Sequence, residues 1–132
     1  MRTTALAWKS SGELAAEIGS FTCKPDLMLF FASRDALSDA YANLRQHLPD
    51  TTLLGCSTGG QFHSTEIEDD RNVGLAVGFD SARCRLANVD VTASGGSFLA
   101  GSMLGQSLVG PDLKAIFVLS EGLGVNGSEL VA

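Results

Sequence analysis

One continuous apolar run, Leu27–Ala32, most constrains the fold of this chain. The run follows Pro25-Asp26 and ends at Ser33, so polar or turn-forming residues bound it on both sides. It is far shorter than the roughly 20 residues that a membrane-spanning helix needs. A short apolar run between such residues is typical of a strand that is covered on both faces, as in a parallel sheet.

Helical and extended patterns alternate around this run. A strand is predicted at Thr3–Trp8, and Ser10 with Glu13 forms a capping box that opens a helix. Asp35 is predicted to cap a second helix, which Pro49 ends, and "TTLLG" follows as a strand. The apolar stripes of the two helices are Leu14, Ile18 and Phe21, and then Leu37, Tyr41, Leu44 and Leu48. The order β-α-β-α-β predicts parallel strands joined by crossover helices.

The second part of the chain shows a different pattern. In "VGLAVGF", from Val73, large residues alternate with glycine and alanine, which predicts a strand whose small face packs closely against another element. "CRLANVDV", from Cys84, is predicted to be its antiparallel neighbour, and a helix is expected from about Gly96 to Val109. The expected class is α/β (α+β), with a mixed sheet and helices packed on it. The residues predicted to be buried are Leu29, Phe31, Leu54, Leu75, Val77, Phe79, Leu104, Phe117 and Val118.

Two segments resemble each other. "PDLKAIFVLS", from Pro111, matches "PDLMLFFAS", from Pro25, with an offset of 111 − 25 = 86 residues. The second copy predicts a strand at Ala115–Leu119, but only the start of a helix follows before Ala132. We therefore expect residues 1–132 to be one partial domain that stops early in its second half, leaving apolar surface that a second copy covers in a homodimer.

Composition excludes several classes of function. The 132 residues carry a net charge of −6 without a basic stripe, which argues against nucleic acid as a partner. The amino-terminal residues lack the apolar segment of a signal peptide, and neither they nor any other run predicts a membrane partner. Three cysteines without metal-ligand spacing predict reduced thiols in a cytoplasmic protein, and neither a cofactor nor a metal site is expected.

The segment "GCSTGG", from Gly55, has two interpretations. Gly55 to Gly59 matches G-x-S-x-G, the spacing of a hydrolase nucleophile elbow. That motif requires a helix directly after the serine and a histidine late in the chain. The following residues show no helical stripe, and the two histidines are His47 and His63. The serine hydrolase interpretation therefore fails.

A cysteine enzyme remains the alternative. Cys56 is a candidate nucleophile for a hydrolase or transferase, with His63 as the group that would activate its thiolate. The acidic residues Glu66, Glu68, Asp69 and Asp70 match no standard cation loop and indicate a solvated charged loop.

The favoured interpretation is a ligand-binding turn. Glycines let a ligand approach the backbone, and serine and threonine hydroxyls both donate and accept hydrogen bonds. Ser33, the turn and Ser120-Glu121 each follow an apolar strand, so all should emerge at the carboxyl edge of the sheet, where open α/β sheets bind ligands. The predicted ligand-binding residues are Ser33, Gly55, Cys56, Ser57, Thr58, Gly59, Gly60, Ser120 and Glu121.

These segments resemble a known family. "PDLMLFFAS", "LRQHLPDTTLLGCSTGGQF", "NVGLAVGF" and "KAIFVLSEGLGVNGSEL" together are similar to the N-terminal domain of the FIST family. The resemblance implies a sensory domain of a bacterial signal-transduction protein that recognises a small molecule, with amino acids or related metabolites as the suggested ligands. It implies no catalytic residues.

Overall fold

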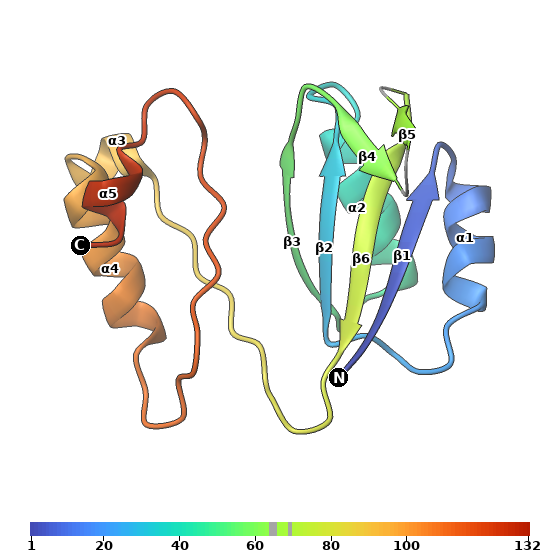
Figure 1. Ribbon diagram of the computed structural model, residues 1–132, viewed down its shortest axis with the longest axis horizontal. Coiled ribbons are helices and arrows are strands. Elements are labelled where there is room, and N and C mark those ends of the chain that lie inside the picture. The colour runs from blue at the N-terminus through green and yellow to red at the C-terminus, as the bar shows by residue number, and fades with distance from the viewer. Residues whose placement is uncertain (64–65, 69) are drawn as a thin grey trace. The chain divides into compact units, whose positions relative to one another are not determined.

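A computed structural model describes the backbone of residues 1–63, 66–68 and 70–132, and the side chains outside 61–69. The chain forms two compact units, Met1–Cys84 and Arg85–Ala132. The first unit contains a sheet with two helices, and the second contains three helices joined by extended segments (Figure 1).

The first unit contains the predicted strands and helices and, in addition, a short hairpin at residues 61–68, where a charged loop was expected. Its strands and helices are β1 (Arg2–Trp8), α1 (Ser11–Gly19), β2 (Leu27–Ala32), α2 (Leu37–His47), β3 (Thr52–Ser57), β4 (Gln61–His63), β5 (Glu66–Glu68) and β6 (Asn72–Gly78). The strands β4 and β5 form a two-stranded antiparallel hairpin of their own.

The main sheet has the strand order β1-β6-β2-β3. Strands β2 and β3 are parallel, and β6 is antiparallel to both β1 and β2, so β1, β2 and β3 all run in one direction. The predicted β-α-β-α-β unit and the mixed sheet are therefore confirmed. The β6 strand fills the position between β1 and β2 that the crossover through α1 leaves open.

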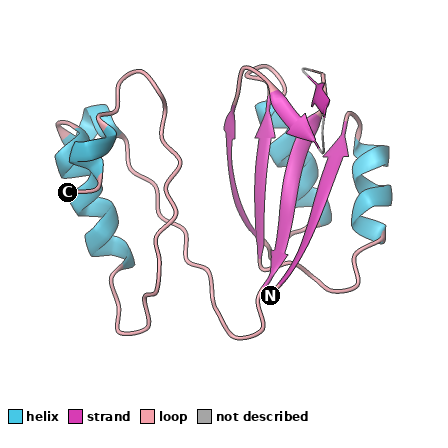
Figure 2. Ribbon diagram, in the orientation of Figure 1, coloured by secondary structure: helices cyan, strands magenta, loops and turns pink. Residues whose placement is uncertain are grey.

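The core lies between one face of this sheet and the helices α1 and α2, and α2 passes behind the sheet in Figure 2. Trp8 and Leu14 have no exposed surface, and Met28 and Leu44 are equally buried. The sheet residues on this face alternate along each strand, as a period of two requires. The core cluster comprises Leu6, Trp8, Leu14, Met28, Phe30, Ala32, Ala40, Leu44, Leu48, Leu53 and Ala76.

Small residues on this face make room for large ones. A Cβ atom at Gly74 would lie 3.1 Å from the Met28 sulfur and 3.2 Å from the Trp8 ring. A Cβ atom at Gly55 would lie 2.5 Å from two ring carbons of Phe30. The predicted close approach on the small face of β6 is thus explained by the side chains that pack on it.

The predicted core residues of the sheet lie mainly on its other face. Leu29, Phe31 and Leu54 are only partly buried, and Leu75 is 37% exposed, whereas Val77 is buried as predicted. The prediction assumed that the face of the sheet with the larger side chains is the buried one. The helices instead cover the other face, on which glycine and alanine leave space for the side chains of Trp8 and Phe30.

The local helix signals were partly correct. Ser10 caps α1, because its hydroxyl accepts a hydrogen bond from the backbone N–H of Glu13 at 3.2 Å. The Glu13 carboxylate accepts in return from the N–H of Lys9. Asp35 does not cap α2. The N-cap residue is Ala36, which has no capping side chain, and the Ser33 hydroxyl accepts a hydrogen bond from the N–H of Ala36 in the turn before the helix.

The second unit consists of α3 (Val91–Ser94), α4 (Ser97–Leu108) and α5 (Gly127–Leu130). The helix predicted from about Gly96 to Val109 is confirmed as α4. A Cβ atom at Gly101 would overlap the Leu130 carbonyl, which shows that α5 packs directly on this glycine. The Ser97 hydroxyl, on a buried residue, accepts from the N–H of Asn126 and connects the segment before α5 to α4.

Two predicted strands do not form. Residues 85–132, all of which the structure describes, contain no strand, so the segments from Cys84 and from Ala115 are extended but unpaired. Phe117 is 61% exposed and Val118 39% exposed, so their predicted burial is wrong. Leu104 and Phe79 are only partly buried. Apolar alternation predicts a strand only where a neighbouring strand supplies hydrogen bonds, and β6 takes β1 and β2 as its neighbours.

Within the described residues, none of the helices has the length and apolar character that crossing a membrane would require.

Candidate functional site

The structure brings Ser33 and the glycine-rich turn together at the carboxyl edge of β2 and β3. Ala32 and Ser57 are register partners, and the N–H of Thr58 donates to the carbonyl of Ala32 at 2.9 Å. The residue after β2 and the turn after β3 therefore leave the sheet side by side, as the parallel arrangement predicted.

The turn is shorter than the motif suggested. Gly55, Cys56 and Ser57 are the last residues of β3, and only Thr58 to Gly60 lead into the following hairpin. The Phe30 ring packs directly on Gly55, so there is no room for a side chain at this position. Gly59 lies outside the left-handed region, and nothing lies within 4 Å of the position of its Cβ. Gly59 therefore leaves open space at the turn and does not supply an unusual backbone angle.

The hydroxyl groups at this edge differ in their availability. The Thr58 hydroxyl donates to the Gly60 carbonyl at 2.9 Å and closes the turn. Ser33 accepts from the N–H of Ala36 at 3.3 Å at the start of α2. Ser57 is exposed, and its hydroxyl forms no hydrogen bond with the residues that the structure describes. Of the three, Ser57 is the hydroxyl that a ligand can reach without breaking an existing contact.

Cys56 does not have the environment of an activated nucleophile. Burial raises the pKa of its thiol, which keeps the sulfur protonated at neutral pH. Its side chain lies on the face of the sheet opposite the helices, next to Phe31. The side chain of His63, the predicted activating group, lies outside the described residues.

Ser120 and Glu121 belong to the second unit, in the extended segment between α4 and α5. The Glu121 carboxylate accepts hydrogen bonds from the backbone N–H groups of Leu123 and Gly124. This carboxylate therefore closes a local turn in its own segment. The structure does not place these two residues in the first unit with the serines of β2 and β3.

Two charged residues at the carboxyl edge were not among the predicted site residues. Arg34 and Asp35 follow Ser33 directly, and both are exposed. They place one guanidinium and one carboxylate in the segment between β2 and α2. The sequence predicted that Asp35 caps the second helix, and for that reason Arg34 and Asp35 were not considered as ligand-binding residues.

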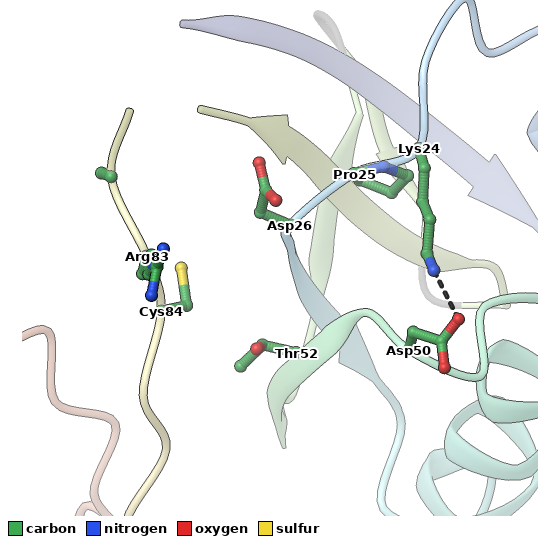
Figure 3. A pocket seen from close by; sticks show the side chains of 8 residues that line it. Lys24, Pro25, Asp26, Asp50, Thr52, Arg83 and Cys84 are labelled. Atoms are coloured by element: carbon green, nitrogen blue, oxygen red, sulfur yellow. Dashed lines mark hydrogen bonds and ion pairs between the residues drawn. The ribbon is translucent and has the colours of Figure 1, made fainter. Parts of the chain in front are cut away.

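The structure also shows a polar pocket of about 340 Å³ at the opposite edge, where β2 and β3 begin. Figure 3 shows Asp26 and Thr52 on one side of it and Arg83 and Cys84 on the other. Lys24 pairs with Asp50 at 2.5 Å, and this pairing lowers the pKa of the Asp50 carboxyl. Burial, with a smaller contribution from the Asp26 carboxylate, raises the pKa of the Cys84 thiol.

The sequence contained a signal for this pocket. Pro25-Asp26 and Pro49-Asp50 precede β2 and β3, so each strand begins just after an aspartate. Parallel strands bring their starts together, which gathers both carboxylates at one edge. Asp26 nevertheless has a structural role, since it accepts from the N–H of Phe79 at 2.7 Å.

No cluster of metal-ligating side chains occurs among the residues whose side chains are described. The acidic residues were expected to form a loop, but Glu66 and Glu68 lie in the strand β5. Asp70 pairs with Lys9, which lowers the pKa of the Asp70 carboxyl. The side chains of Glu66, Glu68 and Asp69 lie outside the described residues.

Comparison with known proteins identifies the family. The model of the FIST N domain matches residues 26–132. An uncharacterized protein of Methanocaldococcus jannaschii is 33% identical over 75 residues, which cover 54% of this chain and 14% of that protein. The chain thus spans a small part of this relative, and no solved structure matches it significantly. The chain belongs to the FIST N domain family, a family of sensory domains in signalling proteins.

Proposed function

We propose that this chain is a non-catalytic sensory domain that binds a small polar metabolite of the amino-acid class at the carboxyl edge of β2 and β3. The observation that carries the proposal is the exposed Ser57 beside the open space at Gly59. Ligands of open α/β sheets bind at this edge. The family supports a sensory role, and the site supplies the chemistry for a ligand.

The polar groups at this edge match the two ends of an amino acid. The Ser57 hydroxyl, which has no hydrogen-bond partner among the described residues, can donate to a carboxylate, and the Arg34 guanidinium is suited to bind the same group with two parallel hydrogen bonds. Asp35 supplies a carboxylate for the ammonium group. A zwitterion of this size needs both charges close together, and Arg34 and Asp35 are neighbours in the chain.

The rival function, a cysteine hydrolase or transferase, has less support. A cysteine nucleophile requires a depressed thiol pKa. The pKa of the Cys56 thiol is raised by burial, and the strand turns this side chain toward Phe31 and away from the helix-covered face.

A thermal-shift screen against the twenty amino acids and related metabolites tests the proposal. A ligand that binds the native state raises the unfolding temperature, by an amount that grows with its concentration. Ser57→Ala should leave the temperature of the free protein unchanged and reduce the ligand-induced shift. Ser81→Ala, an exposed serine beyond the end of β6, is the matched control and should keep the full shift.

Two results would contradict the proposal. If Ser57→Ala no longer folds, the serine is a structural part of the turn. If the ligand-induced shift survives Ser57→Ala and Arg34→Gln, the ligand binds elsewhere on the protein.

A further inference from the structure

The polar pocket at the edge where β2 and β3 begin is formed within the first unit. All of the residues that line it lie between Lys24 and Cys84, inside the range Met1–Cys84. Its volume of about 340 Å³ falls within the roughly 300–1,000 Å³ that is typical of small-molecule sites. A small molecule therefore has room to bind there.

One wall of the pocket is held in place by hydrogen bonds of Asp26. Its N–H donates to the carbonyl of Val77 at 2.9 Å, and its carbonyl accepts from the N–H of Thr52 at 3.0 Å. Its carboxylate accepts from the N–H of Phe79 at 2.7 Å through the atom Oδ2. These bonds fix Asp26 to β3 and to the end of β6. The other carboxylate oxygen accepts no hydrogen bond from the described residues, so it remains available to a ligand.

The opposite wall carries a cation. Figure 3 shows Arg83 across the pocket from Asp26. Lys24, the other cation at the pocket, is paired with Asp50 at 2.5 Å. Arg83 forms no ion pair with any residue that the structure describes, so its guanidinium can bind a ligand. The pocket thus presents an available carboxylate on one wall and an available guanidinium on the other.

We propose that this pocket binds an elongated zwitterion, a molecule whose carboxylate and ammonium groups are separated by several bonds, such as an ω-amino acid or a dipeptide. Arg83 binds the carboxylate with two parallel hydrogen bonds, and Asp26 accepts from the ammonium group. An α-amino acid fits less well, because both of its charged groups are attached to one carbon and cannot reach both walls. This inference does not depend on the ligand proposed at the carboxyl edge.

The rest of the lining suits a ligand without net charge. The Thr52 hydroxyl forms no hydrogen bond with the described residues, so it can donate to or accept from the ligand. Burial, with a smaller contribution from Asp26, raises the pKa of the Cys84 thiol, so the sulfur adds no charge at neutral pH. The charged side chains of the lining sum to zero, since the basic and acidic ones are equal in number: Lys24, Arg83, Asp26 and Asp50.

Calorimetric titration of the full chain with zwitterions of increasing length tests the proposal. The series is glycine, β-alanine, 4-aminobutyrate and 6-aminohexanoate. We expect the affinity to rise about tenfold or more from glycine to the best of the longer ligands, because only these reach both walls. Hexanoate and hexylamine, which carry one charge each, are the controls and should bind more weakly than 6-aminohexanoate by a similar factor.

Two variants assign the charges to the walls. Arg83→Gln should weaken the binding of 6-aminohexanoate about tenfold and leave that of hexylamine unchanged. Asp26→Asn should weaken both, since it removes the charge but keeps an oxygen that accepts from the N–H of Phe79. Arg2→Gln is the matched control, because Arg2 is an exposed arginine outside the lining. Folding of each variant is verified by the fluorescence of Trp8, which is buried in the first unit.

Thiol labelling gives a second readout. Occupation of the pocket should slow the alkylation of Cys84, which lines it, and leave that of Cys56, which does not, unchanged. Equal affinity for glycine and 6-aminohexanoate, or binding that survives both Arg83→Gln and Asp26→Asn, would overturn the proposal. Protection of Cys56 alone would also overturn it, and would place the zwitterion at the carboxyl edge in agreement with the proposed function.

Discussion

The packing of Gly55 against Phe30 makes a sharp prediction for the substitution Gly55→Ala. The new methyl group would start 2.5 Å from the Cδ1 and Cε1 atoms of Phe30 and 2.5 Å from its carbonyl oxygen. Ordinary carbon contacts are 3.5–4.0 Å, so the atoms must separate by about 1 Å. Phe30 is only 3% exposed, which leaves its ring no solvent to move into.

Overpacking of this kind costs about 1–3 kcal/mol. Without a clash, alanine would be more stable than glycine in a strand by about 0.5–1 kcal/mol. A net loss of stability would therefore be caused by the clash with Phe30 and not by the change in backbone freedom. For a unit of this size, the loss corresponds to a fall in unfolding temperature of roughly 5–20 °C.

The assay is urea unfolding followed by the fluorescence of Trp8, which reports on the first unit. Gly59→Ala is the control, because nothing lies within 4 Å of its Cβ position, and it should change the unfolding free energy by less than about 0.5 kcal/mol. In a double-mutant cycle, Phe30→Leu should recover part of the loss caused by Gly55→Ala, with a coupling of about 1 kcal/mol. If Gly55→Ala is as stable as the wild type, the close contact between β2 and β3 has been misjudged.

Three further predictions concern the cap, the thiol and the second unit. Ser10→Ala should destabilise the first unit by about 1 kcal/mol in urea unfolding, because the N–H of Glu13 loses its acceptor, and an unchanged midpoint would refute the cap. Alkylation of Cys56 should be slow at pH 7 and accelerate only at a more alkaline pH than that of an ordinary exposed cysteine, since burial raises its thiol pKa, whereas fast labelling at neutral pH would favour an enzyme. Gly101→Ala should increase amide exchange in α5 by displacing Leu130, while Gly105→Ala, with open space around it, should not.

The sequence predicted the elements of the first unit better than their partners. The apolar run of β2 and the capping box at Ser10 depend on local chemistry, and both appear as expected. The neighbours of β6 depend on where the crossover through α1 leaves a gap in the sheet, and no local pattern encodes that. The predicted partner from Cys84 was therefore wrong.

The choice of the core face failed for a similar reason. In β6, the larger side chains of Val73, Leu75 and Val77 favoured their own face as the buried one. The deciding factor was the size of Trp8 and Phe30 on neighbouring strands, which need glycine opposite them. The pattern of one strand does not show which side chains of the neighbouring strands pack over its small residues.

The candidate site shows the same division. The meeting of Ser33 with the turn after β3 follows from parallel strands and was predictable. The roles of individual residues were not, because Gly55 packs on Phe30 and Glu121 closes its own turn. The charged pair Arg34 and Asp35 was missed because Asp35 was expected to cap α2, whereas the N-cap residue is Ala36, which has no capping side chain.

The position of the ligand is tested by chemical-shift mapping of the ¹⁵N-labelled chain with the amino acid that gives the largest thermal shift. We predict saturable shifts at the amides of Ser33, Arg34 and Ser57 to Gly60, at the carboxyl edge of β2 and β3. Shifts confined to Asp26, Thr52 and Cys84 would place the ligand in the pocket at the opposite edge and contradict the proposed function. The absence of saturable shifts with every amino acid and metabolite in the panel would contradict it as well.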